Sequence, residues 1–341
     1  MNPVDSFLAA QGYAGAARRP LPQDAGHRRY TRLIGGPRPA LLMDCGDAAR
    51  VGLTPEEDLI PFLRLARHIR GLGLSAPEVL GEDPARGLLL VEDLGEATHA
   101  ALLDAGADPL PLYTAAAEAL AALHAAPPPP GLPAWEAPRM AETAGLTFLD
   151  WWWPESFGEP PSPAIRAAFH DALRTMLDPF RGAGCLVHRD YFPANLIDLP
   201  DRAGPRRTGI LDFQDAGLGH PAYDLVSLVE DARRDVRPDV REATIARYLA
   251  ARPELEAEGF RAAFAAQAAQ RHLRVAALWV RLARRDGKPR YLAHGPRCWA
   301  LLEQALRHPA AAPLAAFLDR HVPPALRRNP ESLRPSKDPA A

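Results

Sequence analysis

Lysine is almost absent from this chain of 341 residues. The 40 basic residues include only Lys288 and Lys337, so 38 of them are arginine. A phosphate-binding loop of the Walker type needs a lysine followed by Ser or Thr, whereas Lys288 is followed by Pro289. The sequence therefore excludes that class of nucleotide site, and it excludes a lysine nucleophile or Schiff base before position 288.

Cysteine, long apolar runs and net charge are also scarce. The three cysteines, Cys45, Cys185 and Cys298, lie far apart without C-x-x-C spacing, which is typical of reduced thiols and not of a zinc site. We find no stretch of 18 apolar residues and no secretory signal pattern, so we expect a cytoplasmic protein without a membrane span. A formal net charge of −2 argues against a nucleic-acid partner. Apolar residues at 47% and charged residues at 24% are typical of a globular chain with about two domains.

The first third of the chain predicts a small sheet with one helix. Thr54-Pro55-Glu56-Glu57 is a capping box at a helix start, and apolar residues follow at helical spacing as far as Ile69. Strand-like runs occupy residues 27–33, 40–44, 78–80 and 88–91. After four prolines at 127–130 the patterns are mostly helical, including 254–285 and 295–308. The predicted fold class is α+β, with a sheet-rich N-lobe (1–94), a larger helical C-lobe (95–328) and a flexible tail (329–341).

Two polar clusters, each bordered by short apolar runs, interrupt this helical region. The first reads His188-Arg189-Asp190, followed after four residues by Asn195. The second is Asp212, which follows an Ile-Leu pair and precedes Phe213. This spacing is the catalytic-loop pattern of kinases and kinase-like phosphotransferases.

Phosphoryl transfer explains why these residue types stand at this spacing. A carboxylate has to orient the attacking hydroxyl, and Asp190 is placed for that role. Oxygen ligands have to hold the Mg²⁺ that bridges the phosphates of ATP, and Asn195 and Asp212 supply them. His188 and Arg189 are predicted to hold the loop by hydrogen bonds. The alternative is a set of polar residues on an ordinary surface loop.

These motifs resemble the aminoglycoside phosphotransferase family, which implies a protein-kinase-like two-lobed fold. The resemblance implies that residues 88–95 (LLLVEDLG) form the hinge that offers backbone groups to adenine, at Glu92, Asp93 and Leu94. It also implies that Asp224, in the segment GHPAYDL, braces the catalytic loop by accepting backbone N–H groups.

Within that family, a branch of anomeric amino-sugar kinases is most similar. The similarity lies in residues 24–30, in ALLMD (40–44), in DFQDA (212–216), in QRHLR (270–274) and in RRDGKPRYL (284–292). It implies ATP-dependent phosphorylation of the C1 hydroxyl of N-acetylmuramate and N-acetylglucosamine during cell-wall recycling, by a monomer. The alternatives are a kinase for another hydroxylated metabolite or aminoglycoside, and a non-catalytic nucleotide-binding regulator.

Protein kinases hold the ATP phosphates with a lysine on the third strand, which pairs with a helix glutamate. Here the corresponding position falls near Met43, and no lysine is at hand. The phosphates must then be held by Mg²⁺, backbone N–H groups and arginine. Among Arg28, Arg29 and Arg32 we favour Arg28, and the alternative for each is a solvated strand charge.

The acceptor site is less clearly marked. Residues 148–153 (FLDWWW) offer Asp150 to sugar hydroxyls and Trp151 to a sugar face, although core packing is the favoured role for any one of these tryptophans, because large aromatic side chains are mostly buried. Gln214 and Asp215 are further acceptor candidates. Few carboxylates lie near Asp190 in the sequence, which favours a neutral or anionic sugar over a cationic aminoglycoside.

Overall fold

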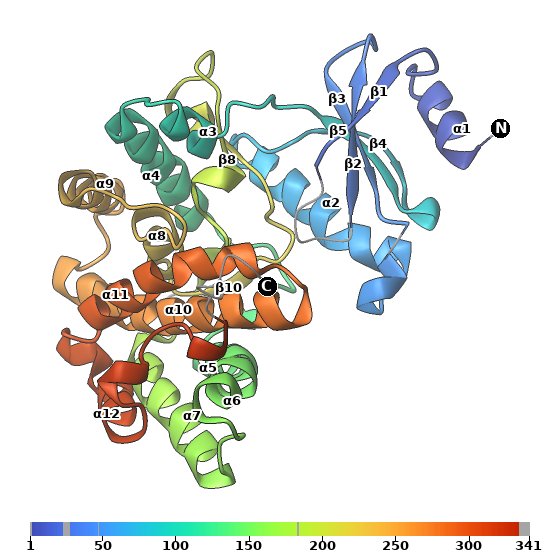
Figure 1. Ribbon diagram of the computed structural model, residues 1–341. Coiled ribbons are helices and arrows are strands. Elements are labelled where there is room, and N and C mark those ends of the chain that lie inside the picture. Colours follow the sequence, from blue (N-terminus) through green and yellow to red (C-terminus); the bar gives the residue numbers. More distant parts are fainter. Residues whose placement is uncertain (1, 23–27, 47, 183, 334–341) are drawn as a thin grey trace. The chain divides into compact units, whose positions relative to one another are not determined.

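The computed structural model describes residues 2–22, 28–46, 48–182 and 184–333, and its elements are labelled in Figure 1. The chain forms two compact units. Unit 1 comprises Met1–Pro129 and Pro193–Ala216, and unit 2 comprises Pro130–Phe192 and Gly217–Ala341. The predicted lobe boundary at residue 94 stays a prediction.

Unit 1 is built on a five-stranded antiparallel sheet in the order β1-β2-β3-β5-β4. Its strands are β1 (Ala17–Pro20), β2 (Arg29–Ile34), β3 (Ala40–Asp44), β4 (Val79–Asp83) and β5 (Leu88–Glu92). Its helices are α1 (Pro3–Ala10), α2 (Pro55–Gly71), α3 (His99–Asp104) and α4 (Pro109–Ala125), and the hairpin of β8 (Leu196–Asp198) and β9 (Thr208–Ile210) belongs to the same unit. The predicted strands and the capped helix are therefore confirmed, with small shifts in their bounds, whereas the sequence patterns did not indicate α1 and β1.

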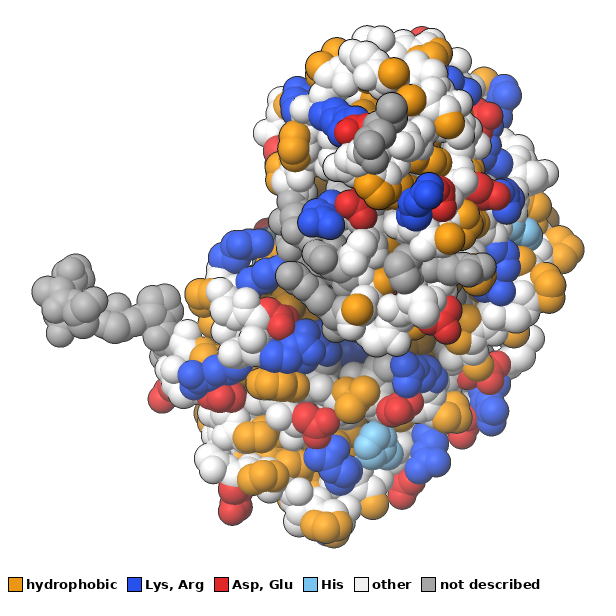
Figure 2. All heavy atoms as spheres, turned by 90° about the vertical axis from the view of Figure 1, so that its right-hand side faces the viewer, with side chains coloured by type: hydrophobic (Ala, Val, Ile, Leu, Met, Phe, Trp, Pro, Cys, Tyr) orange, Lys and Arg blue, Asp and Glu red, His pale blue; other side chains and the backbone are white. Residues whose placement is uncertain are grey.

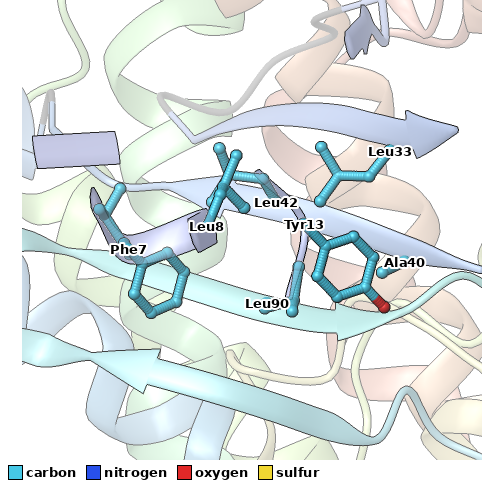
Figure 3. Close-up of a cluster of buried hydrophobic side chains, with 8 residues drawn as sticks. Phe7, Leu8, Tyr13, Leu33, Ala40, Leu42 and Leu90 are labelled. Atoms are coloured by element: carbon cyan, nitrogen blue, oxygen red, sulfur yellow. The ribbon is translucent and has the colours of Figure 1, made fainter. Parts of the chain in front are cut away.

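Both faces of this sheet are covered, because its central strands are apolar on both sides. Leu42 and Leu90 face a cluster that α1 completes with Phe7 and Leu8, as Figure 3 shows. Met43, which alternates with Leu42 along β3, is fully buried. Figure 1 shows α1 and α2 on the two sides of the sheet. Met43, near which we expect the position of the kinase lysine, is thus an apolar core residue.

Unit 2 is mainly helical around a small three-stranded sheet in the order β6-β10-β7. These strands are β6 (Ala134–Trp135), β7 (Cys185–Val187) and β10 (Gly217–Gly219). The helices are α5 (Ala137–Thr147), α6 (Trp153–Phe157), α7 (Pro163–Leu177), α8 (Ala222–Val229), α9 (Pro238–Ala250), α10 (Ala257–Arg285), α11 (Gly295–Ala305) and α12 (Ala312–His321). A Cβ at Gly219 would lie 2.5 Å from the Trp135 carbonyl oxygen, so the close approach of β10 to β6 requires glycine there. The α+β class, with a sheet-rich N-terminal region and a helical C-terminal part, is confirmed.

The surface mixes charges of both signs, as the balanced composition predicts. In Figure 2 blue and red side chains lie next to one another across the face in view. Ion pairs such as Arg67–Glu82 at 2.6 Å and Arg86–Asp83 at 2.8 Å account for part of this pattern. No helix among the described residues combines the length and the apolar character that crossing a membrane would require.

Candidate active site

The predicted site residues fall into two groups, one in each unit. In unit 1, Asn195 directly precedes β8 and Asp212 follows β9, and these two strands pair with Leu196 opposite Ile210. The hairpin therefore brings the two side chains together. The Asn195 amide donates to Asp212 Oδ2 at 3.2 Å, and the Gln214 amide donates to Asp212 Oδ1 at 2.7 Å.

This arrangement fits a magnesium ion. Asp212 is exposed to solvent, so its carboxylate is accessible, and a rotation of the Asn195 amide presents a second oxygen. Mg²⁺ is commonly held by one or two protein oxygen ligands together with water and substrate phosphates. A dedicated cage of three or more His, Cys, Asp or Glu side chains does not occur in the part of the chain that the structure describes.

Backbone strain occurs in both motifs of the kinase pattern. Among the described residues, Arg189 (φ 76°) and Asp212 (φ 60°) are the non-glycine residues with positive φ. Such conformations cost of order 1–3 kcal/mol and gather at functional sites. Phe213, the neighbour of Asp212, is fully buried and packs on Phe62 of α2 with ring centroids 5.0 Å apart, which anchors the strained turn.

Arg28 makes an ion pair that the sequence patterns did not reveal. Its guanidinium donates to Asp58 Oδ2 at 3.0 Å, to Asp58 Oδ1 at 2.8 Å and to the Asp58 carbonyl oxygen at 2.9 Å. The side chains are only 12% and 3% exposed. Burial opposes the charged form of Arg28, but the Asp58 carboxylate outweighs it and raises the pKa of Arg28. A basic residue at the start of β2 thus pairs with an acid on α2, as the lysine and the helix glutamate do in protein kinases.

The charges of both Arg28 and Asp212 act on Tyr30, which lies in the same unit. Burial raises the pKa of Tyr30 to about 12, Arg28 acts in the opposite direction, and the Asp212 carboxylate raises it further. The predicted capping box is confirmed, because the Glu57 carboxylate accepts the Thr54 N–H and the Thr54 hydroxyl accepts the Glu57 N–H. Asp58, the next residue, is the acid that turns inward and pairs with Arg28. A signal was present in the sequence, since Asp58 is a lone acid among the apolar residues of the buried helix face.

The hinge residues lie at the end of β5. The N–H groups of Glu92 and Asp93 already donate to Glu78 and Pro39 carbonyl oxygens at 2.8 and 3.2 Å. Asp93 also pairs with Arg32, and Glu92 with Arg202 at 2.9 Å. Within the described residues, the Leu94 N–H makes no hydrogen bond to a protein acceptor. Leu94 is therefore the residue of the predicted hinge whose backbone N–H is not used by a described residue.

In unit 2, Asp224 holds the loop that carries Asp190. Asp224 lies in the first turn of α8 and is fully buried. Its Oδ2 accepts the His188 N–H at 2.6 Å and its Oδ1 accepts the Arg189 N–H at 2.8 Å. The buried His188 ring accepts the Asp190 N–H at Nδ1 over 3.3 Å. Three successive N–H groups of the loop are thereby fixed by side chains.

Two arginines of this unit lie near the ring of Trp135. The Arg189 guanidinium lies over the Trp135 ring, 4.0 Å from its centroid, and Arg274 of α10 lies 5.9 Å from the same ring. Arg274 donates to the Tyr223 hydroxyl at 3.0 Å. Burial opposes the charged form of Arg274, but Tyr223 and Asp190 outweigh it and raise the pKa of Arg274. The sequence patterns gave no sign of Trp135.

The acceptor candidates predicted from the sequence are divided between the two units. Asp150 accepts from Arg166 at 2.7 Å, and Trp151 beside it is half-buried. Trp152 and Trp153 are buried in an aromatic core around Phe148, so the packing interpretation holds for those two. Asp150 and Trp151 belong to unit 2, whereas Gln214 and Asp215 belong to unit 1. Residues 24–27 of the N-terminal similarity lie outside the described residues.

These features define a kinase-like phosphotransferase, and the chain belongs to the phosphotransferase enzyme family, whose model matches residues 17–257. It is 39% identical to the N-acetylmuramate/N-acetylglucosamine kinase of Caulobacter vibrioides, with 95% of this chain and 97% of that protein covered. It is 34% identical to the protein of the same name from Pseudomonas aeruginosa, over 88% and 87% of the two chains.

Solved structures of low sequence identity support the fold. A choline/ethanolamine kinase family protein from Mesorhizobium loti has a TM-score of 0.60 at 16% identity, covering 93% of this chain and 98% of that one. An aminoglycoside phosphotransferase in a ternary complex with AMP-PNP and hygromycin B has a TM-score of 0.57 at 17% identity, covering 89% and 98%. The predicted kinase-like fold and family are confirmed.

Proposed function

We propose that the protein transfers the γ-phosphoryl group of ATP to the anomeric hydroxyl of N-acetylmuramate and N-acetylglucosamine. The observation that carries this proposal is the 39% identity over nearly the full length of both chains to a kinase named for these sugars. The kinase-like motifs, with their strained and braced backbone, support a catalytic protein over a nucleotide-binding regulator. The reaction belongs to cell-wall recycling and takes place where ATP is available, in the cytoplasm.

Asp190 is the residue that we assign to the acceptor hydroxyl. As a carboxylate it accepts the hydroxyl proton and orients the oxygen toward the phosphorus. An anomeric hydroxyl is more acidic than an ordinary alcohol, so positioning contributes more than basicity. The bonds from Asp224 and His188 to the loop backbone fix the Asp190 main chain and so restrict where its carboxylate can lie.

Asn195 and Asp212 are the residues that we assign to Mg²⁺, which when bound neutralises charge on the β- and γ-phosphates. The protein's own contribution is to keep both oxygen ligands at one end of the β8–β9 hairpin. The Gln214 amide, at 2.7 Å from Asp212, orients the carboxylate.

Arg28 and the hinge complete the nucleotide half of the site. We assign the phosphates to Arg28, which Asp58 holds in a fixed orientation as the helix glutamate holds the kinase lysine. Adenine is assigned to the backbone after β5, where the Leu94 N–H is the available donor. Both assignments use residues of unit 1.

A sugar-acceptor panel tests the proposed function. Purified protein, ATP and Mg²⁺ are incubated with each amino sugar, with other hexoses and with aminoglycosides, and the products are identified by ³¹P and ¹³C NMR. We expect phosphate on C1 of both N-acetylated sugars, and Asp190→Asn should lower kcat by about 10²- to 10⁴-fold with ATP affinity nearly intact. Phosphate on another carbon or another acceptor would replace the sugar assignment, and binding of ATP without any transfer would favour the regulator.

A further inference from the structure

One arginine near the catalytic loop has its charged group held in place but not neutralised. Arg233 follows α8, and its guanidinium lies over the Phe192 ring, 4.4 Å from the centroid, and 5.2 Å from the centroid of the Trp279 ring. Phe192 is two residues after Asp190 in the same loop. Arg233, Phe192, Trp279 and Asp190 all belong to unit 2.

The aromatic partners of Arg233 are themselves rigid. Trp279 is 1% exposed, donates from Nε1 to Cys298 Sγ at 3.2 Å, and stacks on Tyr291 with ring centroids 5.3 Å apart and planes 6° from parallel. Phe192 is also buried. A guanidinium that lies on ring faces keeps its N–H groups in its own plane, where they can form the two parallel hydrogen bonds that a carboxylate accepts.

The guanidinium of Arg233 makes no hydrogen bond or ion pair with any described residue. The nearby carboxylate of Asp231 accepts the backbone N–H of Arg233 at 2.9 Å, not its side chain. By contrast, Arg241 pairs with Glu230 at 2.7 Å and Arg297 with Asp235 at 2.5 Å. The half-buried Arg233 is thus a fixed cation with its hydrogen-bond donors available.

Charged groups of both signs lie around Arg233. Burial lowers the pKa of His294, and the charges of Arg233 and Arg297 lower it further, while Asp231 acts in the opposite direction. Arg274 of α10, by contrast, donates to the Tyr223 hydroxyl at 3.0 Å. An anionic ligand group is therefore the chemistry that would satisfy Arg233.

We propose that Arg233 binds the carboxylate of the acceptor sugar and is the residue that favours N-acetylmuramate over N-acetylglucosamine. The two sugars differ by the lactyl ether on O3, which carries the carboxylate, so a single fixed guanidinium distinguishes them. This assignment rests on the proposed function. We assign the acceptor and not the ATP phosphates because Arg233 belongs to the unit that contains Asp190, whereas Asn195, Asp212 and Arg28 belong to unit 1.

The test compares Arg233→Gln, which removes the charge, with Arg233→Lys, which keeps the charge but not the two-pronged geometry. Arg261→Gln, an exposed position on α10 that pairs with Glu242 at 3.3 Å, is the control for a change of net charge. For Arg233→Gln we expect kcat/KM for N-acetylmuramate to fall about 10- to 100-fold more than kcat/KM for N-acetylglucosamine, through KM. Arg233→Lys should lie between wild type and Arg233→Gln, and Arg261→Gln should leave the ratio unchanged.

Equal losses for the two sugars would overturn the assignment, because they would mean that Arg233 only supports the loop. A rise in KM for ATP without a change in the sugar ratio would also overturn it and assign the guanidinium to phosphate. Calorimetric titration of both sugars, with a non-hydrolysable ATP analogue present, separates this inference from the proposed function. Tight binding of N-acetylmuramate that depends on Arg233 but leads to no phosphorylation would retain the inference and refute the function. Absence of both binding and phosphorylation would refute both.

Discussion

Replacing Asp224 by asparagine tests how the catalytic loop is held. The side chain of Asp224 is fully buried, and its two oxygens accept the N–H groups of His188 and Arg189 at 2.6 and 2.8 Å. Asparagine has nearly the same shape, but it has one acceptor oxygen and no charge. In Asp224→Asn an NH₂ group must face one of the two N–H donors, so one hydrogen bond is lost and the other becomes a neutral one.

The size of the effect follows from these contacts. A hydrogen bond to a charged group contributes about 1.5–3 kcal/mol, and a buried N–H left without an acceptor costs about 1–3 kcal/mol. We therefore expect Asp224→Asn to lower the free energy of unfolding by about 2–4 kcal/mol, which most domains survive. The two bonds also hold Arg189 at its positive φ, so the loop should relax and kcat should fall by about 10²-fold, since small misplacements have effects of that size.

Urea unfolding followed by circular dichroism gives the stability change, and steady-state kinetics gives kcat. Asp239→Asn is the matched control, because Asp239 also lies in the first turn of a helix but is exposed and contacts Arg237. Wild-type stability together with wild-type turnover in Asp224→Asn would refute the reasoning. A stability loss with unchanged kcat would refute only the link to catalysis.

Three further predictions concern unit 1. Asp212→Ala should abolish Mg²⁺-dependent turnover, and retained activity across a Mg²⁺ titration would contradict the metal assignment. Asp58→Ala leaves the buried charge of Arg28 unpaired and should cost about 3–5 kcal/mol in urea unfolding, less when combined with Arg28→Met; equal costs would argue against the ion pair. Burial lowers the pKa of His99 from 6.5 to about 4, so the unfolded chain takes up a proton first on acidification. The free energy of unfolding should therefore have its full value above pH 6.5 and fall by roughly 3 kcal/mol as the pH is lowered toward 4. His99→Gln should reduce this dependence of the unfolding free energy on pH.

Local sequence signals were sufficient for the elements that obey a simple period or a cap. The capping box at Thr54 and the apolar run at 40–44 predicted α2 and β3 within a residue or two, because the hydrogen bonds and the alternation that define them are local. In contrast, β1 has four exposed residues, Ala17–Pro20, and so carries no apolar pattern to recognise.

The candidate site shows the same limit. The spacing from Asp190 to Asn195 and the Asp212 motif are contiguous in sequence and were read directly. The partner of Arg28 is Asp58, 30 residues away, and only the tertiary fold determines which acid of the first turns of α2 turns inward. The contacts of Arg233 with the Phe192 and Trp279 rings join three segments that are distant in sequence, so no spacing along the chain could have revealed them.

The pairing of Arg28 with Asp58, in place of a lysine pair, has a practical consequence for detection. Nucleotide probes that acylate an amine beside the ATP phosphates label protein kinases at the lysine of the third strand. An arginine guanidinium stays protonated and is not a nucleophile near neutral pH, and residues 1–287 contain no lysine at all. With Arg28 assigned to the phosphates, we expect such probes to label this protein only through Lys288 or Lys337, the two lysines of the chain.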